Sequence, residues 1–399
     1  MVRPPFHNWY LPLFGFFYFG QGYSLGSLAL MFPIYIRDVL GVASEAKTIF
    51  ISSMLLFPWY LKFVYGFVSD NFPIGKFGRR KPYLVIAAVL SFYGWITLLL
   101  HESVNMGFIL SSLSLAFGSA ISDTVIDGLG VEITPRSYVS RLQGTAWGGR
   151  GLGIGMAGIA SSLLVKLYGW AAMMEVSAFF GISMVLVVLI LPEGKMLVNP
   201  LPSQSLNHIR QMLLHQEASA KIFYLLFSGA SLAIIPLFSF LLNNDFDYDV
   251  VDFSIPSFFF AFGAFLGSFL MAIIFIKKET KLQVVIVHVI YSATLFIGIF
   301  HLKFRSFLPI EAYFVALGIG AGLVESFQLK VIQEISPQRI EGTAFAIWTG
   351  ISNIGQFILG GILLSQLADF FRLSFLEILQ FSHFFLILAV IALFKINRH

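Results

Sequence analysis

The sequence contains no cysteine among its 399 residues, and only 21 residues are aspartate or glutamate. The absence of cysteine excludes disulfide bonds, thiolate catalysis and cysteine-ligated metal sites. Charged residues make up 12% of the chain, whereas about 25% is usual in soluble domains. So little charge excludes an ordinary water-exposed surface around a soluble core.

The chain is rich in apolar residues instead: 57% are hydrophobic, 45 are phenylalanine, and the mean hydropathy is +0.84. The apolar runs are about 20 residues long, the length of a helix that spans a bilayer, and too long for the strands of a membrane barrel. The lipid bilayer is therefore the expected partner. The isoelectric point of 9.1 reflects lysine and arginine on one membrane face, and we expect no nucleic-acid partner. No cleavable signal peptide is expected, because the first apolar run begins at about Trp9 without a nearby small-residue cleavage site.

Twelve transmembrane helices are predicted, which makes this an all-α membrane protein. The polar stretch 193–218 separates residues 1–192 from residues 219–399, so we expect two six-helix bundles joined by a cytoplasmic linker. Part of the linker, 205–217, has the pattern of a short amphipathic helix on the membrane surface. The predicted spans are 9–36, 48–68, 82–100, 106–131, 143–166, 171–191, 219–242, 254–276, 282–301, 309–333, 343–366 and 374–395.

The distribution of lysine and arginine predicts the orientation. Most of those outside the spans lie in the two termini and in the loops that follow the even-numbered helices. Cytoplasmic loops carry such an excess, so both termini are expected in the cytoplasm. The expected location is a bacterial cytoplasmic (inner) membrane.

The two halves repeat a motif. Residues 132–135 read EITP and residues 334–337 read EISP, an offset of 202, and each is followed by Gly-Thr-Ala, at 144–146 and 342–344. The repeat predicts two pseudo-symmetric halves, with a binding site near the midplane where they meet. The predicted helices 143–166 and 343–366 are also rich in glycine, which we interpret as close helix packing.

Several charged residues lie inside predicted spans, where each costs about 2.5–3.5 kcal/mol. Asp123 and Asp127 share one face of the fourth helix, because they are four residues apart. The offset of 202 makes Glu325, in the tenth helix, the counterpart of Asp123. The candidate substrate and proton-coupling residues are Lys62, Asp123, Asp127, Arg150, Glu325 and Lys330.

Two functional roles and one structural role are open for these residues. Two nearby carboxylates cannot both ionise cheaply in a low dielectric, so one of them could load and release a proton during transport. Alternatively, the cations bind an anionic substrate, and Arg150 can grip a carboxylate or phosphate with two hydrogen bonds. The structural role is a buried ion pair of Asp123 or Asp127 with Arg150 or Lys62.

A charged loop follows the second predicted helix. It contains Asp70, Arg79 and Arg80, at the face expected to be cytoplasmic. We interpret these residues as a gate that holds the halves closed, with Glu132 and Glu334 as candidate partners of the arginines.

This loop, in the form G-x-x-S-D followed by G-R-R-x-P, resembles the loop between helices 2 and 3 of the major facilitator superfamily. Residues 57–84 and the segment SDTVIDGLGVE at 122–132 are similar to the folate–biopterin transporter family. The R-R-x-P run also resembles the glycoside–cation symporters. The resemblance implies a proton-coupled secondary transporter, with Lys62, Asp123, Asp127 and Arg150 as the residues to carry over. The expected substrate is a small polar or anionic solute, with a folate-like or pterin-like compound favoured.

We therefore expect a monomeric transporter coupled to protons or sodium. A sugar carrier and a non-transporting scaffold or assembly factor on the same fold are the alternatives. The sequence shows no nucleophile–base constellation, metal-ligand cluster or cofactor motif, so an enzyme is not expected.

Overall fold

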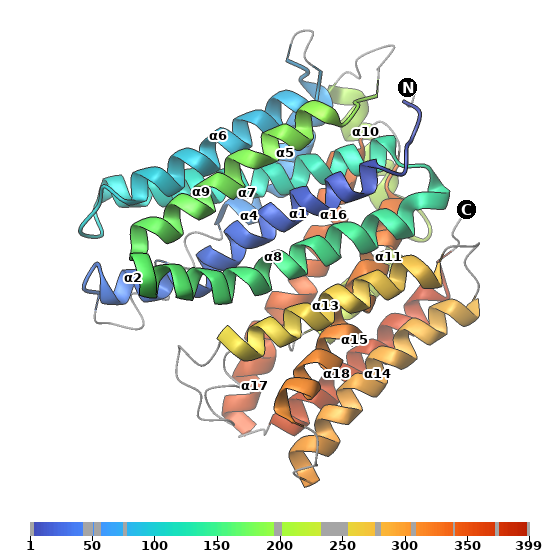
Figure 1. Ribbon diagram of the computed structural model, residues 1–399. Helices are drawn as coiled ribbons and strands as arrows, with labels where there is room; N and C mark the ends of the chain where they lie inside the picture. Colours follow the sequence, from blue (N-terminus) through green and yellow to red (C-terminus); the bar gives the residue numbers. More distant parts are fainter. Residues whose placement is uncertain are drawn as a thin grey trace. The chain divides into compact units, whose positions relative to one another are not determined.

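The computed structural model describes residues 4–42, 51, 57–74, 78–194, 202–232, 254–275, 281–304, 309–337, 340–371 and 375–396. Within these residues every regular element is a helix (Figure 1). Each of the twelve predicted helices overlaps helical residues there, so the prediction of an all-α membrane protein is confirmed. Among the described helices, six are long and apolar enough to span a membrane: Lys81–Leu98, Met106–Ile133, Arg136–Tyr168, Trp170–Ile190, Ile255–Ile274 and Glu311–Ile335.

The chain forms two compact units. Unit 1 comprises Met1–Pro135, Gly149–Ser205 and Gln338–Ala346, and unit 2 comprises Arg136–Gly148, Leu206–Pro337 and Ile347–His399. Three of the described helices contribute residues to both units: α8 (Val139–Tyr168), α10 (Pro202–Leu214) and α16 (Glu341–Asn353). The division into bundles 1–192 and 219–399 stays a prediction.

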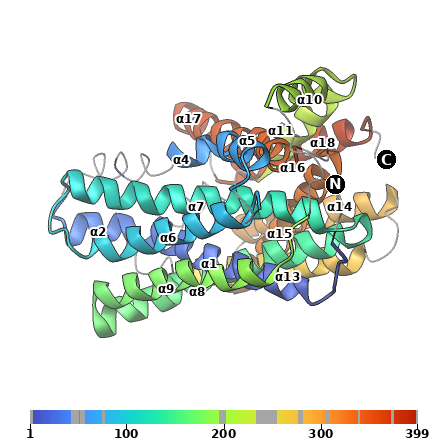
Figure 2. The same ribbon diagram turned by 90° about the horizontal axis from the view of Figure 1, so that it is seen from above.

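In unit 1, α6 packs against both α7 and α9, and α1 packs against α9 (Figures 1 and 2). The second predicted helix is interrupted: α4 ends at Tyr60 and α5 begins at Lys62. The helices of this unit are α1 (Tyr10–Gly26), η1 (Ser27–Met31), α2 (Phe32–Asp38), α4 (Phe57–Tyr60), α5 (Lys62–Asn71), α6 (Lys81–Leu98), α7 (Met106–Ile133) and α9 (Trp170–Ile190).

Packing and hydrogen bonds hold these helices together, because lipid supplies no hydrophobic force between them. Phe32 stacks on Phe108 with ring centroids 5.5 Å apart. Trp95 is fully buried, and its indole N–H donates to Ser24 Oγ at 2.9 Å. At the start of α7, the Asn105 side chain accepts from the backbone N–H of Phe108 at 2.9 Å and caps the helix. The first turn of the long helix that carries Asp123 and Asp127 is thus capped by Asn105 and packed against Phe32.

In unit 2, α15 packs against α13 and α14, and α18 packs against α11 and α14 (Figure 1). The eleventh predicted helix runs from α16 through a π-helical segment, η4, into α17. The helices of this unit are α11 (Ala218–Ser231), α13 (Ser254–Ile274), α14 (Lys281–Phe304), α15 (Ile310–Ile335), η4 (Ile354–Leu363), α17 (Leu364–Phe371) and α18 (Phe375–Leu393).

The expected linker helix is present as α10 (Pro202–Leu214). Its buried Ser205 hydroxyl donates to Asn71 Oδ1 at 2.6 Å, at the end of α5. The contact attaches the start of α10 to the segment that leads into the charged loop.

Candidate functional site

A buried ion cluster in unit 1 contains three of the residues singled out in the sequence. Asp123, on α7, is 1% exposed and pairs with Lys62 Nζ through Oδ2. Its other oxygen, Oδ1, accepts from Arg150 Nη1 at 3.0 Å. One buried carboxylate therefore binds two cations from two different helices.

The break between α4 and α5 positions Lys62. Pro58 lacks an N–H, and Leu61 leaves helical geometry with φ −90° and ψ 8°. Lys62 is the next residue and the first of α5. Interrupted helices of this kind form substrate and ion sites in membrane carriers.

Trp59 lies beside both cations of the cluster. Its ring centroid is 5.3 Å from Lys62 Nζ and 5.6 Å from Arg150 Cζ. Both distances are within the range of a cation–π interaction. The aromatic face and the two cations together provide a surface for a planar or anionic solute.

Asp127, one helical turn after Asp123, has different surroundings. It is half-buried and accepts a hydrogen bond from the hydroxyl of Tyr18, on α1. Within the described part of the chain, no cation forms an ion pair with Asp127. Asp127 therefore contacts a neutral donor, whereas Asp123 contacts two charged ones.

Glycines bring α1 close to α8, and so bring Tyr18 close to the cluster. A Cβ on Gly149 would lie 2.2 Å from the carbonyl oxygen of Gly15, and a Cβ on Gly153 would lie 2.2 Å from that of Phe19. Contacts this short are impossible for other residues, so the interpretation of these glycines as packing positions is confirmed. Gly350, in α16, has nothing within 4 Å of its Cβ position, so the interpretation does not hold there.

Several polar side-chain atoms of unit 1 are buried without hydrogen-bond partners among the described residues, and they include the two amide atoms of Gln21 and the indole N–H of Trp59. Buried polar groups are normally paired with protein, water or a ligand. Gln21 lies one turn after Tyr18 on α1, and Trp59 is beside Lys62 and Arg150. A polar solute or water bound beside these groups would supply the hydrogen-bond partners that they lack.

A second network in unit 1 is built on Arg79 and is almost fully enclosed. Arg79 Nη2 donates to Glu132 at 2.6 Å and to Glu341 at 2.9 Å. Burial alone would lower the pKa of the Arg79 guanidinium, but the carboxylates of Glu341, Glu132 and Asp70 outweigh it and raise this pKa above its ordinary value.

Arg80 and Asp70 join the start of α16 to the same network. Arg80 is fully buried; it pairs with Asp70 and donates to Ser69 Oγ at 2.6 Å. Asp70 also accepts from the backbone N–H and the hydroxyl of Thr343, at 2.7 and 2.6 Å. A carboxylate at the first turn of a helix satisfies free N–H groups and complements the helix dipole.

Glu193, just after α9, organises the loop itself. Its carboxylate accepts from the backbone N–H groups of Arg79 at 2.5 Å and Arg80 at 2.9 Å, where α6 begins. Gly78 has φ +101°, and a Cβ there would lie 2.4 Å from this carboxylate. The glycine is therefore required both by the turn and by the approach of Glu193.

The predicted site residues of α15 lie in unit 2. Lys330 is buried 3.5 Å from Glu334, one turn later on the helix, and 4.5 Å from the ring centroid of Phe275. Glu325 is half-buried on the same helix. Glu334 thus contacts a lysine of its own helix, while Glu341 is the acid from the second repeat that contacts Arg79.

The sequence did not single out Glu341, Glu193, Gln21 or the hydroxyl of Tyr18. A signal existed for Glu341, which directly precedes the repeated Gly-Thr-Ala. Gln143 precedes the first copy of this motif, and in unit 2 its amide donates to Gln333 at 2.7 Å. In both repeats the residue before Gly-Thr-Ala makes a polar contact, charged in one and neutral in the other.

Comparisons with known proteins agree with the fold. The family model described as Major Facilitator Superfamily matches residues 14–360. A probable folate-biopterin transporter 4 of Arabidopsis thaliana is 33% identical over 170 residues, which are 41% of this chain and 33% of that protein. A folate-biopterin transporter of Synechocystis is 30% identical over 168 residues, again 41% of this chain and 33% of the relative. The matches thus span about a third of the length of these relatives.

Solved structures extend the similarity over nearly the whole chain. The human organic anion transporter MFSD10 superposes with a TM-score of 0.72 at 12% identity, covering 99% of this chain and 100% of its own. The proton:xylose symporter XylE superposes with a TM-score of 0.68 at 14% identity, covering 97% and 94%. At such low identity these structures show the fold alone.

Proposed function

This chain belongs to the Major Facilitator Superfamily, and we propose that it is a secondary transporter that moves a small polar or anionic solute by alternating access, coupled to protons. The observation that carries the proposal is the cluster around Asp123: two buried cations on one carboxylate, with a second carboxylate one turn away. The relatives are transporters by name, and none is an enzyme.

The charges of the cluster link proton binding to solute binding. The cations Lys62 and Arg150 balance Asp123 and Asp127 when both carboxylates are ionised. Protonation of Asp127 leaves one positive charge in excess. A buried uncompensated charge is costly, so the protonated cluster favours an anionic solute and the deprotonated cluster releases it. Asp127 is the proton carrier in this scheme because it contacts only a hydroxyl.

The proposed substrate class is folate-like or pterin-like. The names of the relatives support it, and so does Trp59, since a planar ring can stack on an indole while a carboxylate meets Arg150. Glu325 and Lys330 are proposed as the corresponding groups of the second repeat. The network of Asp70, Arg79, Arg80, Glu132 and Glu341 is proposed as the cytoplasmic gate, and Glu334 as a pairing partner of Lys330.

We also propose that the chain is a monomer in a bacterial inner membrane with both termini in the cytoplasm, on the basis of its lysine and arginine distribution. Because the sequence lacks cysteine, single cysteines introduced in the loops can be labelled from either side of the membrane without background. If a loop that follows an even-numbered predicted span were labelled from outside the membrane, this orientation would be contradicted.

Uptake into proteoliposomes under an imposed pH gradient tests the proton coupling. Asp127→Asn is expected to reduce gradient-driven uptake to background while the protein keeps its thermal stability and its solute binding. The matched control is Asp38→Asn, since Asp38 is exposed and its ion pair in the described part of the chain is with the adjacent Arg37. Undiminished, gradient-dependent uptake by Asp127→Asn would remove Asp127 from the mechanism.

A ligand screen tests the substrate class. A ligand that binds the folded state raises its apparent stability by mass action, so thermal unfolding is measured with folate, biopterin, a disaccharide, a nucleoside and an amino acid. A shift with folate or biopterin that is weakened in Arg150→Lys supports the proposal, because lysine lacks the guanidinium fork. A shift only with the disaccharide favours the sugar carrier, and no transport of any solute favours the scaffold.

A further inference from the structure

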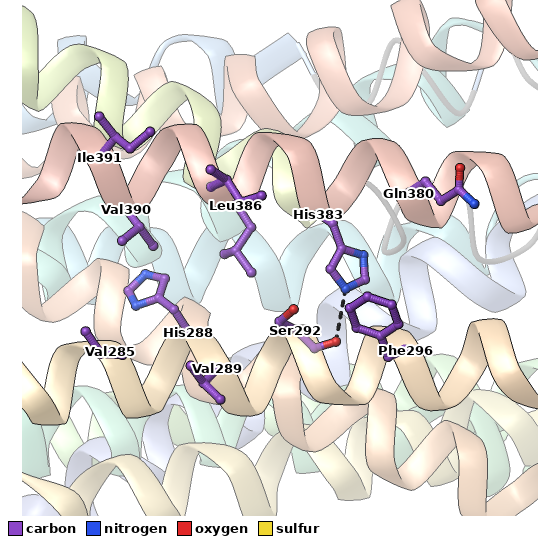
Figure 3. Close-up of a pocket in the computed structure, with 11 residues that line it drawn as sticks. Val285, His288, Val289, Ser292, Phe296, Gln380, His383, Leu386, Val390 and Ile391 are labelled. Carbon is purple, nitrogen blue, oxygen red and sulfur yellow. Dashed lines mark hydrogen bonds between the residues drawn. The ribbon is translucent and has the colours of Figure 1, made fainter.

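A groove of about 480 Å³ lies in unit 2 between α14 and α18. Its lining consists of two facing rows of side chains, one from each helix, as Figure 3 shows, and His383 points toward Ser292. The volume falls in the range of about 300–1,000 Å³ that is common for small-molecule sites. None of the residues proposed above for transport lines it.

The rim of the groove faces the surroundings of the protein. The rim residues are more than half exposed: Val289 58%, Phe296 60%, Ile387 59% and Ile391 53%. One ring nitrogen of each histidine contacts a helix carbonyl oxygen: His383 Nε2 that of Ser292 at 3.0 Å, and His288 Nδ1 that of Val284 at 2.8 Å. The groove therefore offers an almost wholly apolar surface.

Membrane lipid is the medium next to this surface, because the chain belongs to a family of membrane-spanning proteins and both helices are apolar. An apolar groove left empty loses dispersion contacts along its whole lining. The rows Val285–Phe296 and Gln380–Ile391 each extend for about 16 Å at 1.5 Å per residue. That length is about half of the roughly 30 Å hydrocarbon core, which suits one lipid tail.

The two ends of the groove differ. Gln380, whose side chain is exposed, lies at one end, and Val285 and Ile391 lie at the other (Figure 3). Gln380 is five residues after the start of α18, so it lies about 8 Å from that end of the helix. An amide near the membrane surface followed by an apolar channel matches the polarity of a phospholipid, with its ester region first and its tail beyond.

We infer that this groove binds one acyl chain of a bilayer phospholipid, with the ester end at Gln380 and the tail running past Ser292 to His288. The end of the tail then contacts His288, which is connected to Lys330 through one aromatic ring. The His288 ring packs edge-on against Phe327 with centroids 5.5 Å apart, and Lys330 Nζ is 5.7 Å from the centroid of Phe327. The groove is a lipid site separate from the proposed solute site.

Photolabelling in vesicles tests this site directly. The full-length protein is reconstituted in phosphatidylcholine that contains a small fraction of phosphatidylcholine with a mid-chain diazirine, and labelled peptides are identified by mass spectrometry. Labelling is expected to concentrate on the groove residues of α14 and α18. Val289→Trp and Ser292→Phe, which fill the groove at its rim and at its centre, are each expected to reduce this labelling at least threefold.

The matched control is Ala293→Phe, which adds an aromatic ring to an exposed position of α14 outside the groove. It is expected to leave the labelling unchanged. Equal labelling of all lipid-facing helices, or labelling that Val289→Trp leaves intact, would overturn the inference. Absence of label together with a dimer in solution would assign the groove to a second copy of the chain. The measurement is of binding, so its outcome does not depend on the proposed transport.

Discussion

Two charged regions of unit 1 differ in how their carboxylates are paired. In the loop network, Asp70, Glu132 and Glu341 all contact the guanidinium groups of Arg79 and Arg80, and all five side chains are almost fully buried. In the cluster around Asp123, this carboxylate forms ion pairs with both Lys62 and Arg150. Asp127 instead accepts a hydrogen bond from the hydroxyl of Tyr18.

The difference indicates two kinds of function. A network in which every carboxylate contacts a guanidinium group holds one conformation, as a gate requires. A cluster with one carboxylate opposite a neutral donor can take up a proton without breaking an ion pair. Variants that unbalance the first region should therefore destabilise the protein, while variants of the second should change transport.

The largest effect is expected from Arg79→Ala. The substitution removes the closest cation of the buried carboxylates of Glu132 and Glu341. It leaves them only the longer contacts to Arg80, at 3.6 and 3.7 Å. Removal of one partner of a buried pair costs about 3–5 kcal/mol. Thermal unfolding in detergent measures the loss. Lys81→Ala, two residues later at the start of α6, is the control, since the Lys81 ammonium donates to the carbonyl of the exposed Leu189 and pairs with no carboxylate among the described residues.

A double variant sharpens this prediction. Glu341→Gln should recover part of the stability lost in Arg79→Ala, because it removes one of the two carboxylates that have lost their closest cation. Strictly additive effects would show that Arg79 and Glu341 do not interact. The ion pair between them would then not connect the network to α16.

Tyr18→Phe tests the cluster that contains Asp123 and Asp127. The tyrosine hydroxyl donates to Asp127, and a hydrogen bond to a charged group contributes about 1.5–3 kcal/mol. Uptake under a pH gradient is expected to fall about tenfold or more and to change its pH profile. Tyr35→Phe, which loses only a 3.3 Å hydrogen bond to the carbonyl of His101, should leave the profile unchanged. The same profile in both variants would show that the hydroxyl does not tune Asp127.

Much of this site was readable in the sequence because charge is so costly in lipid. Lys62, Asp123 and Arg150 stand out as charges within apolar spans, and such charges need partners, so their meeting could be anticipated. The helices were also readable, since long apolar runs and polar loops alternate throughout. Asp70 with Arg79 and Arg80 stood out as a charged loop between two such runs.

The choice of partners was not readable. Glu334 and Glu341 are both acids near the second repeat motif, and the sequence favoured Glu334. In the structure Glu334 is one turn from Lys330 on the same helix, whereas Glu341 is the first residue of α16, beside the N–H groups that Asp70 binds. Tyr18 could not be recognised for another reason. Because 16% of the residues are aromatic, a single tyrosine in the sequence does not indicate a functional site.

A smaller effect is expected where α1 approaches α8. Gly149→Ala places a methyl group 2.2 Å from the carbonyl oxygen of Gly15, and overpacking of this kind costs about 1–3 kcal/mol. Since the shift also moves Tyr18 and Arg150 apart, uptake should fall together with thermal stability. Gly350→Ala, at a glycine with open space around it, is the control. An unfolding temperature that Gly149→Ala leaves unchanged would mean that α1 and α8 can separate without cost.

The smallest effect is expected from Glu193→Gln, which separates the shape of the loop from its charge pairing. Glu193 binds backbone N–H groups at the start of α6 and not the guanidinium groups, so its loss resembles the loss of a helix cap, about 0.5–2 kcal/mol. The amide of glutamine still accepts hydrogen bonds, which leaves only the charge–dipole part to be lost. Thermal stability should therefore decrease slightly, and less than in Arg79→Ala, with the exposed Glu102→Gln as control. A loss as large as that of Arg79→Ala would place Glu193 within the ion network, because only an unpaired buried charge costs so much.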